Sequence, residues 1–124
     1  MKFARWVYAI AGIYGIVVLV PGFFLLERVG RDMPPPVTHP EYYYGFYGVT
    51  LVWQFAFLLI SRDPARYRPL MPITVLEKAA WAITIGWLAS TGTVAPPLIA
   101  FAAIDTVLGV LFGMAFGKTL KAES

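Results

Sequence analysis

Four apolar stretches, separated by polar segments, dominate the pattern of hydrophobic and polar positions along the chain. They cover residues 6–26, 42–60, 73–91 and 98–117. The first two contain no charged residue, the third carries Glu77 and Lys78 in its first turns, and the fourth carries Asp105. About 20 apolar residues in a helix cross the roughly 30 Å hydrocarbon core of a bilayer. The pattern therefore predicts an all-α fold, a bundle of four transmembrane helices.

Prolines and glycines separate the stretches, and the composition supports a membrane environment. The separating residues are Pro34-Pro35-Pro36, Pro40, Pro64, Pro69, Gly92, Pro96 and Pro97. Apolar residues make up 59% of the 124 positions and charged residues 14%, against about 45–50% and about 25% in soluble domains. The spans leave no segment for a soluble domain, so we expect residues 1–124 to form a single integral membrane domain.

Basic residues predict the orientation of this domain. Two of the ten, Arg28 and Arg31, fall on one side of the four spans. The other eight fall on or near the opposite side: Lys2, Arg5, Arg62, Arg66, Arg68, Lys78, Lys118 and Lys121. Because basic loops stay on the cytoplasmic side, both termini are predicted to be cytoplasmic, in a multi-pass protein of a bacterial inner membrane. The first stretch resembles a secretory signal, but its ~20 apolar residues exceed the usual 7–15 and favour a retained span.

Four polar side chains are predicted to lie at similar depth in the four spans. They are Tyr14, Gln54, Thr84 and Asp105, each roughly 10–18 Å from an end of its span at 1.5 Å per residue. An acid inside a membrane suggests a proton relay, an ion site or a ligand anchor. Asp105 can equally serve packing, by hydrogen bonding to the other three side chains. Both alternatives stay open on the sequence.

Glycines spaced four apart follow this acid. Asp105, Gly109, Gly113 and Gly117 differ by only about 40° from one to the next around a helix. Small residues at this spacing let another helix approach closely. We therefore expect Asp105 to point into the bundle, and the Gly109 and Gly113 face to pack within it, in a homodimer or against a partner subunit.

Glu77 and Lys78 are neighbours in sequence near the start of the third span. They project about 100° apart, unlike an i,i+4 ion pair. Lys78 is predicted to extend toward the lipid headgroups. Glu77 is favoured there by the helix macrodipole.

Further candidates lie at the predicted membrane surfaces. His39 and Glu41, beside three tyrosines, are candidates for the mouth of a cavity, or simply mark the start of a helix. Arg62, Arg66 and Arg68 are candidates for binding lipid headgroups.

Several chemistries are excluded by what the chain lacks. Cysteine is absent and His39 is the only histidine, which excludes disulfides, thiolate metal sites and two-histidine haem or zinc centres. We expect no cofactor and no metal. The net charge of +3 is distributed by membrane topology, so nucleic acid is not an expected partner.

The stretch PEYYYGFYGVTLVWQFAFLLISRDPARYRPLMPITVLEK, with IDTVLGVLFG later, resembles small bacterial four-helix membrane proteins and is loosely similar in plan to the DoxX-like proteins. The resemblance covers nearly the whole chain but carries no catalytic signature. It implies a membrane accessory subunit, in some cases linked to quinone or sulfur redox systems. Sterol-isomerase-like four-helix proteins share the plan and use acids inside the bundle, but no clear pair of such acids is evident in this sequence.

Three functional readings follow. The first is a small membrane protein that serves as an accessory subunit or binds a lipid-like or quinone-like molecule in the bundle centre, with membrane lipids as its surroundings. The second is an enzyme acting on a hydrophobic substrate with Asp105 or Glu77 as acid or base, which requires two converging titratable groups in a cavity. The third is a small transporter, although no span is broken at its centre as transporter helices often are.

Overall fold

The computed structural model describes residues 2–33, 37–92 and 94–123, and every regular element in that part of the chain is helical. The elements are α1 (Lys2–Gly22), α2 (Leu26–Asp32), α3 (Pro40–Arg62), the 3₁₀ turn η1 (Arg68–Leu70), α4 (Met71–Ser90) and α5 (Pro96–Glu123). The predicted all-α class is confirmed. Pro34–Pro36 of the predicted first connection lie outside the described residues.

Three of these helices are long and apolar enough to cross a membrane. They are α1, α3 and the Pro96–Lys121 part of α5, and they correspond to the first, second and fourth predicted spans. The fourth long helix, α4, contains Glu77 and Lys78 and is not among them. The predicted helix in each apolar stretch is present, and the membrane-crossing character is supported for three of the four.

The helix ends depart from the predicted boundaries for identifiable reasons. Helix α1 ends at Gly22, one residue after Pro21, instead of continuing to residue 26, because proline obstructs the helical hydrogen bonds around it. The Tyr43 hydroxyl donates a 2.7 Å hydrogen bond to the Gly22 carbonyl, which satisfies an oxygen at this helix end. The chain then forms α2, a short helix that the sequence analysis did not predict. At the end of α4, Gly92 adopts φ +73°, the left-handed conformation that commonly terminates helices.

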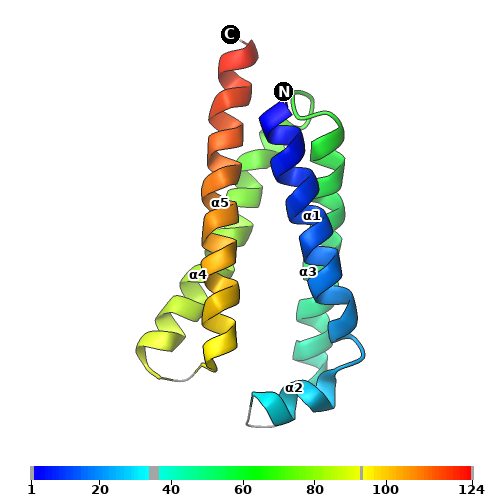
Figure 1. Cartoon of the computed structure of the whole chain (residues 1–124), viewed down its shortest axis with the longest axis vertical. Coiled ribbons are helices and arrows are strands. Elements are labelled where there is room, and N and C mark those ends of the chain that lie inside the picture. The colour runs from blue at the N-terminus through cyan, green and yellow to red at the C-terminus, as the bar shows by residue number, and fades with distance from the viewer. Residues whose placement is uncertain (1, 34–36, 93, 124) are drawn as a thin grey trace.

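The long helices form two pairs that meet near the termini. Helix α1 packs along α3, α4 packs along α5, and α1 also contacts α5. Figure 1 shows both termini at one end of the molecule and α2 at the other. The core lies at the terminal end, where the Tyr8 and Phe112 rings stack with centroids 4.3 Å apart. Its buried residues are Ala4, Tyr8, Ala11, Phe57, Ile60, Met71, Leu108, Phe112 and Ala115.

The close packing of α1 against α3 depends on the glycines of α1. A Cβ at Gly15 would overlap the Gln54 side chain of α3, and a Cβ at Gly22 would overlap the Tyr47 ring. By contrast, a Cβ at Gly113 or Gly117 would meet no atom within 4 Å. Gly113 and Gly117 are therefore not needed for packing within the described part of this chain, and their packing in a homodimer or against a partner subunit stays a prediction.

Candidate functional site

The two helix pairs separate toward α2 and leave a cleft of about 260 Å³ between them. Its walls come from α1 and α3 on one side and from α4 and α5 on the other, and Val29 of α2 also lines it. Apolar and aromatic side chains predominate, among them Val18, Phe46, Tyr47, Trp81, Leu98 and Phe101. A mostly apolar cleft with a few polar groups is the usual form of a small-molecule site.

Three charged side chains meet at this cleft. Lys78 is only 4% exposed, and its Nζ lies 3.4 Å from Asp105 Oδ1 and 3.7 Å from Glu77 Oε2. The ammonium also lies 5.1 Å from the centre of the Phe57 ring. We call Glu77, Lys78 and Asp105 the charged triad. A buried charge requires such partners, because the energy of removing it from water is otherwise uncompensated.

The Lys78 side chain packs against the backbone of α5. Asp105 and Gly109 are one turn apart on the same face, and a Cβ at Gly109 would lie 3.3 Å from Lys78 Cβ. The glycine therefore leaves room for the lysine stem while Asp105 reaches its ammonium group. The predicted shared face of Asp105 and Gly109 is confirmed, and what it packs against is Lys78.

Two expectations for the pair on α4 were wrong. Lys78 does not extend to a headgroup region but is buried against Asp105, and it also forms an ion pair with its sequence neighbour Glu77. The long lysine side chain can bend toward a residue that projects about 100° away. Helical spacing alone therefore does not exclude the contact.

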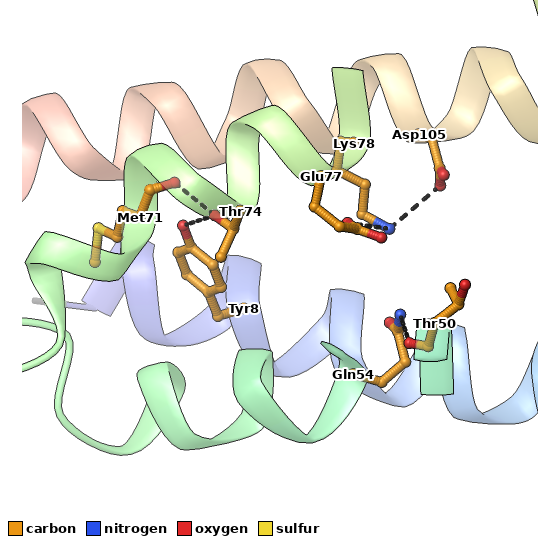
Figure 2. Close-up of polar contacts among 8 residues, drawn as sticks. All are labelled: Tyr8, Thr50, Gln54, Met71, Thr74, Glu77, Lys78 and Asp105. Atoms are coloured by element: carbon orange, nitrogen blue, oxygen red, sulfur yellow. Dashed lines mark hydrogen bonds and ion pairs between the residues drawn. The ribbon is translucent and has the colours of Figure 1, made fainter. Parts of the chain in front are cut away.

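Gln54 faces the triad from the opposite wall. Figure 2 shows its amide, on α3, directed across the cleft toward Glu77 and Lys78 on α4. The amide nitrogen donates a 2.8 Å hydrogen bond to the Thr50 carbonyl. Gln54 is 1% exposed, and its Oε1 has no hydrogen-bond partner among the described residues; Glu77 Oε2 likewise accepts no hydrogen bond from them, although it lies in the ion pair with Lys78. Unpaired buried oxygens are rare and call for an explanation.

No protein-family model, curated protein or solved structure matches this chain. The resemblance to DoxX-like proteins therefore stays a prediction. What the chain can bind or transform is inferred from the geometry of its cleft.

Three of the four predicted midplane residues line the cleft. Tyr14, Gln54 and Asp105 do so, together with Glu77. Thr84 does not: its side chain is exposed and its hydroxyl donates to the Ala80 carbonyl of its own helix. The prediction that Thr84 faces the bundle centre was wrong.

The surface candidates lie away from the cleft. His39 Nδ1 and Glu41 Oε1 are 2.8 Å apart, both side chains are exposed, and neither lines the cleft. Arg62 and Arg66 are exposed near the terminal end, where the Arg66 backbone nitrogen donates to Asp63 Oδ1. Arg68 begins η1 at the same end. Headgroup binding by these three arginines stays a prediction.

The sequence analysis missed several residues that shape the site. Trp81 and Phe46 approach each other from α4 and α3 with ring centroids 6.2 Å apart, and both line the cleft. Trp81 lies three positions after Lys78, so its place on the same helical face was available from spacing. Among the described residues, no group of three or more histidine or acidic side chains is arranged to hold a metal ion.

Proposed function

We propose that this chain is a four-span membrane protein that binds an amphiphilic small molecule in the cleft. Three helices with membrane-crossing length support this architecture. Helix α4 runs back along α5 after a short connection (Figure 1). Its Lys78 is paired inside the molecule with Glu77 of the same helix and with Asp105 of α5, which lowers the free energy of placing these charges in a bilayer. The proposed orientation puts both termini in the cytoplasm of a bacterial cell, as the distribution of basic residues suggests.

The observation that carries the binding function is the charged triad at an otherwise apolar cleft. Apolar walls would hold a hydrocarbon or aromatic tail, and the triad with Gln54 would hold a polar head. This assigns the intramembrane acid Asp105, as a member of the charged triad, to holding the polar head of the ligand.

Filling the cleft tests this function. In Leu98→Trp, a larger side chain would occupy the cleft wall of α5, whereas Val107→Trp places the same side chain on the exposed surface of that helix. Native mass spectrometry of protein extracted with its lipids should find one small molecule per chain in wild type and in Val107→Trp, and none in Leu98→Trp. A wild-type protein with no bound molecule, or a Leu98→Trp protein that retains it, would contradict the function.

A specific observation also favours a second candidate, a membrane enzyme. Two carboxylates, Glu77 and Asp105, converge on one ammonium at the cleft, and the enzyme reading required such converging titratable groups. Glu77 or Asp105 would act as acid or base on a hydrophobic substrate. Incubating wild type, Glu77→Gln and Asp105→Asn with a lipid extract separates the two functions. If the protein is an enzyme, the wild type changes the mass spectrum of the extract and the two variants do not. If it only binds, none of the three proteins changes the spectrum.

A further inference from the structure

The charged triad has two acidic groups and one basic group. When all three are ionised, Glu77 and Asp105 contribute two negative charges and Lys78 one positive charge. Among the described residues that line the cleft, Lys78 is the only basic one. An uncompensated negative charge in apolar surroundings is unfavourable, so the cleft is electrostatically suited to a positively charged group.

Two buried oxygens at the cleft, both hydrogen-bond acceptors, receive no hydrogen bond from the described residues. Gln54 Oε1 belongs to a side chain that is 99% buried, and Glu77 Oε2 lies on the opposite wall. Gln54 cannot exchange its oxygen and nitrogen without placing the oxygen against the Thr50 carbonyl that its nitrogen now contacts. Among the described residues Gln54 Oε1 has no donor, and Glu77 Oε2 has only the Lys78 ammonium at 3.7 Å, which is too far for a hydrogen bond. Donors to a carboxylate are strongest when they are charged.

Aromatic rings surround the remaining space. Tyr14, Phe46, Tyr47, Trp81 and Phe101 all line the cleft. The faces of such rings attract cations, most strongly for tryptophan. The two acids beside one base, the acceptors without a hydrogen bond and the aromatic walls are separate observations. Each favours a positively charged head group.

We propose that the ligand of this cleft is an amphiphilic amine, bound as an ammonium ion whose N–H groups donate to Gln54 and Glu77. This inference depends on the proposed binding function and narrows it. The ammonium would balance the charged triad, and its hydrocarbon or aromatic part would lie along Trp81, Leu98 and Phe101 toward α2. A neutral quinone-like head presents carbonyl acceptors, which can meet Lys78 but donate no hydrogen bond to Gln54 Oε1 or Glu77 Oε2.

Three small probes of similar shape test the head group. We would measure binding to the protein in nanodiscs of zwitterionic lipid by calorimetry at pH 7, with empty nanodiscs as the blank. 2-Phenylethylamine supplies positive charge and N–H donors, 2-phenylethanol supplies a neutral donor, and benzyltrimethylammonium supplies charge without a donor. Hydrogen bonds to charged groups contribute about 1.5–3 kcal/mol, so the amine should bind at least about tenfold more tightly than the alcohol. Benzyltrimethylammonium should fall between the two.

Matched variants test whether the preference for the amine over the alcohol arises at the cleft. Glu77→Gln keeps the shape of the side chain and removes the excess negative charge, so it should bring the amine and the alcohol within about twofold of each other. Glu41→Gln makes the same change at an exposed carboxylate outside the cleft and should leave the wild-type ratio.

The outcomes for the two proposals are distinguishable. Equal binding of amine and alcohol by wild type would overturn the ammonium inference and leave the binding function standing. An amine preference that persists in Glu77→Gln would also overturn it. No binding of any probe to wild type would contradict the binding function itself.

Discussion

Of the glycines in α1, Gly15 leaves the least room for a side chain, and its replacement by alanine is the clearest perturbation of the fold. The new Cβ would lie within van der Waals overlap of Gln54 Oε1 and Cδ. The Gln54 amide would have to leave its slot, losing its hydrogen bond to Thr50 at about 1 kcal/mol, and overpacking adds about 1–3 kcal/mol. Alanine recovers about 0.5–1 kcal/mol through its higher helix propensity. We expect Gly15→Ala to lower the free energy of unfolding by about 1–3 kcal/mol.

Gly113→Ala is the matched control, because a Cβ there would meet nothing within 4 Å. Only helix propensity changes, so this variant should be neutral or more stable by up to about 1 kcal/mol. Unfolding in mixed dodecylmaltoside and dodecyl sulfate micelles, followed by far-ultraviolet circular dichroism, gives both values. Combining Gly15→Ala with Gln54→Ala removes the clashing group and should cost less than the sum of the single changes. Equal stability of Gly15→Ala and Gly113→Ala would refute the packing described for α1.

Two further predictions concern the buried polar contacts. Lys78→Met leaves the carboxylates of Glu77 and Asp105 without their cation. It should destabilise the protein toward the lower end of about 3–5 kcal/mol, since both carboxylates are slightly exposed. Adding Asp105→Asn should recover part of this loss, and no recovery in the same unfolding assay would argue against the ion pair. Tyr8→Phe removes the 2.8 Å hydrogen bond to Thr74 and should lower stability by about 0.5–1.5 kcal/mol, whereas an unchanged unfolding midpoint would mean that this buried bond contributes nothing.

The helices were predictable from sequence because apolar length alone specifies them. Each predicted span contains a long helix, and the prolines that begin α3 and α4 mark where those helices start. The short helix α2 was not predictable in this way. Its seven residues are too few for a periodic pattern to stand out.

The site was only partly predictable, because periodicity gives the angle between residues on one helix but not which face meets a neighbour. The buried residues Thr74, Lys78 and Ile85 define the inner face of α4. Thr84 is six positions after Lys78 and therefore points about 240° around the helix from it. Once Lys78 is known to be buried, the exposure of Thr84 follows.

The pairing of Lys78 with Asp105 depends on contacts between residues 27 positions apart, which local spacing does not reveal. The role of Gly15 was more accessible. Ala4, Ala11, Gly15 and Gly22 recur at helical spacing along α1 and are all buried. The small residues of α1 thus carried the packing signal that the sequence analysis assigned to α5.

Photolabelling tests the central claim, that the cleft binds an amphiphile, most directly. The probe is decylamine with a diazirine in the middle of its chain, applied to the protein in nanodiscs, with the labelled residues identified by peptide mass spectrometry. We predict labelling of Val18, Leu98 and Phe101 on the cleft walls, and its loss when unmodified decylamine competes. Labelling confined to outward-facing positions of α5 such as Val107 and Val110, or labelling that decylamine does not reduce, would contradict the claim.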